Sequence, residues 1–489
     1  MRWKAVIVAA CLLGACGGGG GGGGDPPPPP PPPVANRAPA ITSAATASFA
    51  ENGTGIAYQA AATDPDGDAV TFRIEGPDAA RFVISASGGI SFVTPPNFEA
   101  PADADGNNAY QITLIASDGK AESRLDLTIS VSNLPDELGG RYFSFPGVAS
   151  ALIPVPGSTD VFVATRTGQI YRWNPAQPAP GTLYLTIGNV GYAGFGEGGV
   201  INIAVPADYQ TSGHLYAYVR SSDQSIHVRR YDRSSAGLGD PASERLIVRV
   251  PYLESFSSSE NLGGGLAFGP DNLLYIGTGI LGIGDSRAQN LSLLHGKILR
   301  LDVSRDDFPG DAARNYGIPA GNPFSSGARE IFAFGLEDPR RMSFDGTNLL
   351  IGDHHRLQGI KTPPEVHLLR PQDAGANFGH LDNQGPNPIP PVITLRPGNI
   401  VSDGSMTGGL VYRGRIQSLV GLYIFADPLN RRTWVVPAVN IVQGRTIQQE
   451  GVGEIPLPPD RPDRVVSFGT DALGNLYFVD GRVYLVEER

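Results

Sequence analysis

The sequence predicts an all-β protein in which a Greek-key β-sandwich precedes a six-bladed β-propeller. The 489 residues include 64 Gly and 43 Pro, about twice the usual share, which favours many short strands joined by turns. Short runs that alternate apolar and polar residues occur between positions 39 and 135, as in half-buried strands. A two-strand pattern then recurs six times between positions 138 and 489, as in the blades of a propeller.

Charge and cysteine content exclude several classes of protein. Asp and Glu number 48 against 37 Lys and Arg, which gives a net charge of −11. Because there is no basic excess to attract phosphates, we expect no nucleic-acid partner. Two cysteines cannot form a disulfide framework.

Residues 1–15 are typical of a signal peptide. Arg2 and Lys4 precede an apolar run from 5 to 13 that is too short to span a bilayer. The segment Leu13–Cys16 resembles the lipobox of bacterial lipoproteins, which implies that a lipid on Cys16 anchors the chain in the bilayer. Gly17 follows in place of the Asp that marks inner-membrane retention, so the resemblance favours the outer membrane of the cell envelope. The alternative is a plain secretory signal in which Cys16 is incidental.

Residues 16–38 are predicted to be a tether. Eight Gly at 17–24 form a flexible coil, and eight Pro at 26–33 form a polyproline II rod of roughly 25 Å. Together they would lift the folded part of the chain off the membrane.

Residues 39–135 are predicted to form the β-sandwich. Its expected strands are four alternating runs at 57–60, 70–74, 110–115 and 125–131. The segment resembles a cadherin or bacterial cadherin-like repeat through the phrases Ala50–Gly53, Asp64–Asp68, Gly89–Phe92, Asn97–Glu99 and Ala116–Gly119.

Calcium is the cofactor predicted for this segment. Asp64, Asp66 and Asp68 place hard oxygen ligands at alternate positions around a Gly turn, as a calcium ion requires. The resemblance adds Glu51, Glu99 and Asp118 to the metal ligands and implies that a protein partner can bind through the repeat. The alternative is that these Asp-rich turns cap themselves with their own side chains.

Residues 138–489 are predicted to form the propeller. Each copy of the repeat is an aliphatic or aromatic run, a turn and a second apolar run. The six pairs are 160–164 with 169–173, 214–219 with 227–231, 273–277 with 297–301, 349–353 with 365–369, 422–427 with 433–436, and 476–480 with 483–486.

This segment resembles the glucose/sorbosone dehydrogenase family of propellers, which use pyrroloquinoline quinone (PQQ). The resemblance rests on seven phrases in the family's order over nearly the whole segment. They are Gly263–Asp271, Ala288–Arg300, Tyr316–Phe324, Glu330–Leu336, Gly375–Gly379, Thr407–Gly414 and Ser467–Gly469. It implies oxidation of a sugar, or of a related alcohol or aldehyde, with PQQ as cofactor.

The residues at the family's site positions differ from the family. The catalytic base position is Asn261, and an amide cannot act as a general base. The Arg-Asn pair that faces the cofactor is here Glu337-Asp338, and two acids repel the tricarboxylate PQQ unless calcium intervenes. Family members carry an Asp after the motif that is Gly277–Gly279 here, whereas this chain has Ile280.

Other residues are candidates for the missing roles. Glu260 is adjacent to the vacant base position, and His354 follows a predicted strand end at Asp353. His355 and His380 are weaker candidates, for which structural roles are the alternative. Glu337, Asp338, Asp353 and a His around the channel would also suit calcium.

Three functions remain open from the sequence. The first is a membrane-tethered PQQ-type sugar dehydrogenase with a calcium-binding stalk. The second is a non-catalytic propeller that binds a glycan or a protein. The third is a calcium-dependent hydrolase that uses the acidic channel.

Overall fold

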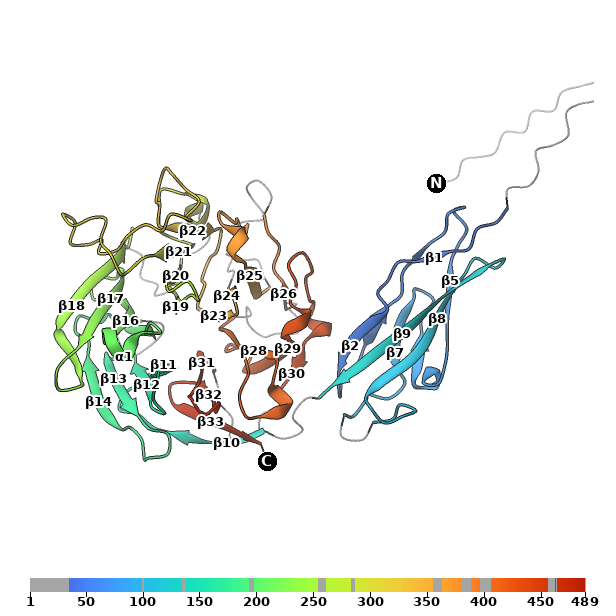
Figure 1. The fold of residues 1–489 in the computed structure, drawn as a ribbon, viewed down its shortest axis with the longest axis horizontal. Coiled ribbons are helices and arrows are strands. Elements are labelled where there is room, and N and C mark those ends of the chain that lie inside the picture. Colours follow the sequence, from blue (N-terminus) through green and yellow to red (C-terminus); the bar gives the residue numbers. More distant parts are fainter. Residues whose placement is uncertain are drawn as a thin grey trace, which may run out of the picture.

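The structure is a computed structural model, in which two β-rich bodies follow one another along the chain (Figure 1). It describes residues 35–98, 101–133, 138–192, 198–253, 261–282, 286–354, 363–379, 388–395, 406–455, 462 and 464–488. Across these residues no helix combines the length and apolar character needed to cross a bilayer. The helical elements are α1 (Tyr209–Ser212) and the 3₁₀ turns η1 (Ala79–Arg81), η2 (Ser286–Gln289), η3 (Pro371–Asp373), η4 (Gln417–Leu419), η5 (Ala438–Asn440) and η6 (Gln449–Gly451).

The first body is a β-sandwich, as predicted. One sheet has the order β2 (Thr46–Ala50), β9 (Glu122–Ser132), β8 (Ala109–Ser117), β5 (Thr71–Glu75). The other has the order β3 (Ile56–Gln59), β7 (Gly89–Phe92), β6 (Phe82–Ile84), and β1 (Ala40–Ile41) pairs with β4 (Ala62–Thr63). The pair β2–β9 is parallel, whereas the other pairs of this body are antiparallel.

Alternation along the strands explains the core of the sandwich. Ile90, Leu114 and Ile129 are fully buried between the sheets, and the ring of Tyr110 meets the rings of Phe82 and Phe92 edge-on. Such aromatic pairs add about 0.5–1.5 kcal/mol each beyond the area they bury.

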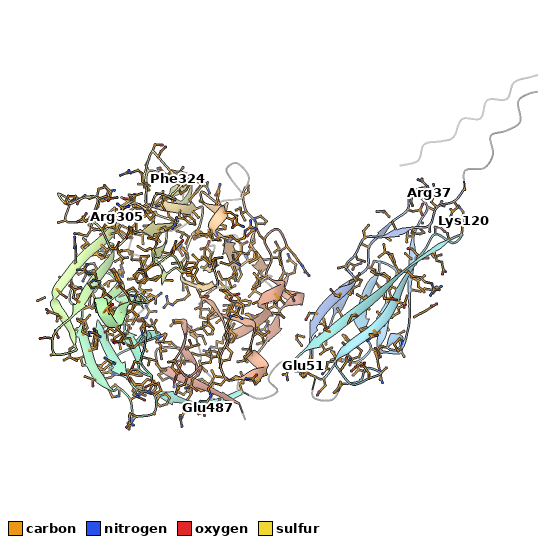
Figure 2. The ribbon with its side chains drawn as sticks, in the orientation of Figure 1. Arg37, Glu51, Lys120, Arg305, Phe324 and Glu487 are labelled. Carbon is orange, nitrogen blue, oxygen red and sulfur yellow. The ribbon has the colours of Figure 1, made fainter. Side chains whose placement is uncertain are left out.

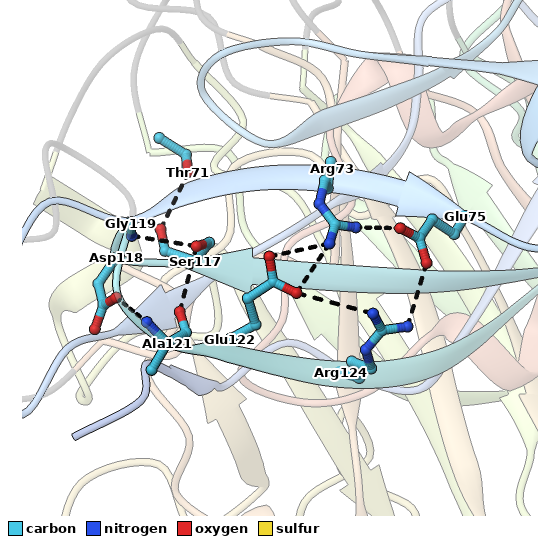
Figure 3. Close-up of polar contacts among 9 residues, drawn as sticks. All are labelled: Thr71, Arg73, Glu75, Ser117, Asp118, Gly119, Ala121, Glu122 and Arg124. Carbon is cyan, nitrogen blue, oxygen red and sulfur yellow. Dashed lines mark hydrogen bonds and ion pairs between the residues drawn. The ribbon is translucent and has the colours of Figure 1, made fainter. Parts of the chain in front are cut away.

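The outer face of β5, β8 and β9 carries a closed ring of ion pairs (Figure 3). Arg73 contacts Glu75 and Glu122, and Arg124 contacts the same two carboxylates. All four side chains are exposed, so each pair contributes little to stability.

The second body is the predicted six-bladed propeller. Within the described residues six four-stranded sheets follow one another around a central axis (Figure 1). Five blades run in chain order from the inner to the outer strand: β11 (Ala149–Pro154), β12 (Val161–Thr165), β13 (Gln169–Trp173), β14 (Thr182–Thr186); β15 (Val200–Ala204), β16 (His214–Arg220), β17 (Ile226–Arg233), β18 (Gly239–Val250); β19 (Gly263–Phe268), β20 (Leu274–Thr278), β21 (Lys297–Leu301), β22 (Ile331–Phe334); β23 (Arg341–Asp345), β24 (Asn348–Asp353), β25 (Glu365–Leu369), β26 (Ile393–Thr394); and β27 (Gly408–Val411), β28 (Leu422–Asp427), β29 (Arg432–Pro437), β30 (Gly453–Glu454).

The sixth blade joins the two ends of the propeller segment. It contains β31 (Ser467–Thr470), β32 (Leu476–Val479) and β33 (Val483–Glu488), and its outer strand is β10 (Leu138–Phe143). β10 pairs antiparallel with β33 from Leu138↔Glu488 to Phe143↔Val483. The ring is therefore closed by backbone hydrogen bonds between strands from opposite ends of the segment.

The predicted repeat corresponds to the two middle strands of each blade, β12–β13 through β32–β33. These strands are nearly continuous apolar runs because both faces pack against neighbouring blades. The prediction of six blades is confirmed.

A partly buried arginine connects the inner strands of several blades. Arg341, at the start of β23, donates through Nη2 to the carbonyls of Ser150 and Ile201, each at 2.9 Å. Its Nε donates to Ser467 Oγ at 3.1 Å. The guanidinium thus connects four different blades.

We expect Arg341→Lys to lower the free energy of unfolding of the propeller by about 1–3 kcal/mol, because one ammonium cannot satisfy acceptors in three other blades. Differential scanning calorimetry measures the change. The matched control is Arg415→Lys, because Arg415 is exposed and its side chain donates a hydrogen bond to Asn475 of a single other blade. Equal unfolding temperatures for the two variants would contradict the prediction.

Candidate functional site

Asn261, at the predicted base position, is buried and directly contacts Glu337. Its Nδ2 donates to Glu337 Oε1 at 2.8 Å and to the carbonyl of Gly282 at 2.6 Å. Its own carbonyl accepts the N–H of Leu281 at 3.1 Å. Asn261 and Leu281 both have φ of 55°, a conformation that costs about 1–3 kcal/mol in a residue such as leucine. The surrounding fold therefore holds this loop in a strained shape.

Asp338 and Asp353 complete a fully buried acidic network with Glu337. Asp338 accepts the N–H of Gly263 at 2.8 Å and Arg340 Nε at 2.5 Å. Asp353, the last residue of β24, accepts the N–H groups of Glu337 at 3.1 Å and Asp338 at 2.7 Å. The loop before β19 and the loop between β22 and β23 are thereby joined to β24.

The residues that the family resemblance singled out are thus brought together. Asn261, Glu337 and Asp338 meet at one place, and Asp353 joins them. His354 follows directly and is buried. Glu260, His355 and His380 lie outside the described residues.

Sequence reasoning missed the cations that surround this network. Arg287 Nη1 donates to the carbonyls of Ile280 and Leu281 at 3.0 and 3.2 Å. Lys297 Nζ is buried and donates to the carbonyls of Arg287 and Ala288, each at 2.9 Å. Arg340 donates to Asp338, and Arg341 donates to carbonyls of the inner strands. All four cationic side chains therefore already bind acceptors within the protein. No local motif marks such roles, because the partners are backbone carbonyls of distant loops.

Gln289 and Asn377 form a second polar pair that the sequence did not predict. Gln289 Nε2 donates to Asn377 Oδ1 at 2.9 Å, and Asn377 Nδ2 donates back to Gln289 Oε1 at 3.1 Å. Asn377 Oδ1 also accepts the N–H of Gly379 at 2.9 Å. The segments that contain these residues, one after β20 and one after β25, are therefore joined by two side-chain hydrogen bonds.

The residues present do not suit PQQ. A tricarboxylate needs cations and hydrogen-bond donors, whereas three buried carboxylates occupy the positions nearest the vacant base. The amide of Asn261 and the guanidinium of Arg340 already bind two of these acids.

The predicted calcium ligands of the sandwich lie at its two ends. Arg37 and Lys120 mark one end and Glu51 the other (Figure 2). Arg37 binds Asp66 at 2.8 Å, and its hydrogen bonds hold the pKa of Asp66 below the usual value. Lys120 binds Asp68 at 2.7 Å.

The other predicted ligands also accept protein donors. Asp64 Oδ1 accepts the N–H groups of Asp66 and Asp68, as the capped-turn alternative expects. Asp118 accepts Asn36 Nδ2 at 2.8 Å, and the fully buried Glu51 accepts the N–H of Phe98 at 2.7 Å. Glu99 lies outside the described residues. Among the residues that are described, no three His, Cys, Asp or Glu side chains form a metal-binding group, so calcium stays a prediction.

Comparison with known proteins supports the resemblance of the propeller. Residues 149–381 match the family model described as Glucose / Sorbosone dehydrogenase. The PQQ-bound aldose sugar dehydrogenase of Streptomyces coelicolor matches with a TM-score of 0.55 and 20% identity, over 72% of this chain and 99% of that one. The apo aldose sugar dehydrogenase of Escherichia coli matches with a TM-score of 0.52 and 18% identity, over 72% and 100%. At these identities the likeness establishes the fold alone.

Curated relatives match parts of the chain. The chain is 26% identical to mouse (Mus musculus) Hedgehog-interacting protein over 309 residues, which are 57% of this chain and 40% of that protein. It is 31% identical to the HIPL2 protein of Arabidopsis thaliana over 268 residues, 47% of this chain and 36% of that protein. Human (Homo sapiens) Cadherin-23 is 22% identical over 173 residues, 34% of this chain and 5% of that protein. The chain thus spans well under half the length of these relatives.

We expect Asn261→Asp to destabilise the propeller by about 1–3 kcal/mol at neutral pH, because a second carboxylate would face Glu337 without a donor between them. Each carboxyl would raise the pKa of the other in the folded state. The loss should therefore grow as pH rises through that raised value and shrink toward acidic pH. Thermal unfolding at several pH values measures it. The control is Asn272→Asp, because Asn272 has φ of 59° but is exposed. A loss that is independent of pH would contradict the prediction.

His295 gives a second pH-dependent prediction. Its Nε2 lies 2.9 Å from the carbonyl of Pro251, and burial lowers its pKa to about 4. Because the unfolded value is about 6.5, the unfolded chain binds the proton more readily between the two values. Stability should fall by up to about 3 kcal/mol as pH drops through this window. His295→Asn should remove that part of the acid sensitivity in unfolding experiments, whereas His214→Asn, at a half-exposed histidine, should leave it unchanged.

Proposed function

We propose that the propeller is a non-catalytic binding module built on a dehydrogenase fold. The observation that carries this proposal is the hydrogen bond between Asn261 and Glu337. The base position of the family holds an amide, and that amide is bound to an acid at the position of the cofactor-facing cation. The amide cannot act as the general base of the family's reaction, and an acid in place of the cation would repel the tricarboxylate PQQ.

The strained loop around Asn261 and Leu281 fits a binding role. Strain of this kind persists only where the surrounding contacts over-determine the conformation, and it is common at ligand sites. Arg287 supplies such contacts, because its guanidinium donates hydrogen bonds to the carbonyls of Ile280 and Leu281. The mouse relative is named as a Hedgehog-interacting protein, so a protein that is similar to this chain over part of its length is named for a protein interaction. A protein partner is accordingly our first expectation for this chain.

A PQQ-dependent sugar dehydrogenase is the second candidate. It is favoured by the match of residues 149–381 to the glucose/sorbosone dehydrogenase family. Under this alternative Glu260 or His354 would replace the missing base, and a calcium ion would separate the acids from the cofactor.

The remaining predictions describe where the module works. We propose that lipid on Cys16 anchors the chain in the outer membrane and that residues 16–38 are the tether. The sandwich would be the stalk. Calcium binding there requires Asp66 and Asp68 to exchange Arg37 and Lys120 for the ion.

The test is a titration of the mature chain, carrying Cys16→Ser, with PQQ and calcium. Isothermal titration calorimetry reports binding, and dye reduction across a panel of aldoses reports turnover. We expect neither signal at micromolar PQQ. Binding together with sugar-dependent dye reduction would contradict the proposal and establish the second candidate.

A double variant shows whether the acids are the obstacle. Glu337→Gln with Asp338→Asn removes two negative charges while keeping similar side-chain shapes. If repulsion excludes PQQ, this variant should bind it more tightly than the natural chain does. Asp345→Asn with Glu454→Gln removes the same charge from half-exposed and exposed positions and should not change PQQ binding.

A further inference from the structure

A groove of about 590 Å³ lies at the rim of the propeller, away from the acidic network. Its lining comes from the end of β18, which is the outermost strand of its blade, from the connection between β20 and β21, and from the long connection between β21 and β22. Its volume is within the range of small-molecule sites in proteins. None of Asn261, Glu337, Asp338 and Asp353 lines it.

Glu330 lines the groove, and one of its two carboxylate oxygens already accepts two hydrogen bonds from the protein. Glu330 is 4% exposed, and its Oε1 accepts Tyr316 Oη and Arg314 Nη2, each at 2.5 Å. Burial raises the pKa of Tyr316, so the phenol keeps its proton and donates it. Within the described residues Glu330 Oε2 accepts no hydrogen bond, although the residue lines the groove. This oxygen keeps some solvent exposure, so it can accept a hydrogen bond from a ligand or from water.

Donors flank this acceptor on both walls. The guanidinium of Arg314 lies over the ring of Phe308, 3.5 Å from its centroid, and the side chain is 37% exposed. Arg249, on the β18 wall, is 43% exposed and also binds Asp223 at 2.9 Å. Asp311 adds a second carboxylate to the lining. Two cations and two acids therefore face the same space.

The remaining lining is apolar or small. Val248, Pro251 and Leu294 form a hydrophobic stretch, and Ser292, Ala313, Gly327 and Ala328 leave room beside it. Gly327 has φ of 76°, and a Cβ there would lie 2.6 Å from the carbonyl of Leu291. This position thus requires glycine, which keeps that wall free of a side chain.

We propose that this groove binds a neutral saccharide. Hydroxyl groups both donate and accept, so they can satisfy a lining in which carboxylates and guanidinium groups alternate. A charged ligand would instead meet a group of its own sign at close range. The C–H face of a sugar ring suits the stretch formed by Val248, Pro251 and Leu294. The site is independent of the proposed function, since it does not involve the acidic network.

The experiment uses the mature chain with Cys16→Ser and a panel of neutral disaccharides: maltose, cellobiose, lactose and N,N′-diacetylchitobiose. Saturation-transfer NMR detects binding, and calorimetric titration gives the affinity of any sugar that binds. We expect Ala313→Trp, which fills the groove from a half-buried position, to weaken that affinity by about tenfold or more. Ala207→Trp, at an exposed alanine between β15 and β16, should bind as the natural chain does.

A second variant tests the chemistry of the site. Glu330→Gln keeps the shape of the floor but replaces an acceptor with a donor, so it should also weaken binding, with its fold checked by circular dichroism. Absence of binding for the whole panel, or equal binding by the Ala313→Trp variant, overturns the proposal. Neither result depends on whether PQQ binds, so failure here is distinct from failure of the proposed function.

Discussion

The closure of the propeller ring is the constraint on which the rest of the molecule depends. β10 and β33 come from opposite ends of the segment and pair along their full length. The guanidinium of Arg341 then connects four blades across the axis. With the ring closed in this way, loops from adjacent blades are fixed against each other. The contact between Asn261 and Glu337 joins the two ends of the blade β19–β22, and the backbone bonds to Asp353 join that blade to the next one.

The same closure allows one fold to hold very different sites. The positions that resemble a dehydrogenase site still converge, although their side chains have changed from a base and a cation to an amide and acids. The network satisfies its own hydrogen bonds, with Arg340 neutralising Asp338. Fold similarity to aldose sugar dehydrogenases therefore does not by itself define the chemistry of this site, because the blades determine where loops meet and the side chains determine what they do.

Much of the fold could be predicted from the sequence, whereas the details of the site could not. The middle strands of each blade, such as β28, are continuous apolar runs and were visible as a repeat. The short, glycine-rich inner strands, such as β27, carry too weak a pattern to be recognised. Nothing local indicates that β10 completes the last blade, because its partner is at the other end of the segment. The family phrases located Asn261 and Glu337, but the hydrogen bond between them depends on strained backbone that only the folded ring defines.

The parallel pair β2–β9 has a mechanical consequence. Arg37, where the tether reaches the sandwich, and Glu51, at the end of β2, lie at opposite ends of this body (Figure 2). Ala50, also at the end of β2, packs against a cluster in the propeller that includes Leu138. A pull on the propeller against a membrane-held tether would thus load β2 and β9 along their length, in shear. The five residue pairs from Thr46↔Thr128 to Ala50↔Ser132 would then resist together rather than unzip one by one, so the geometry of this pair suits the proposed role of the sandwich as a stalk.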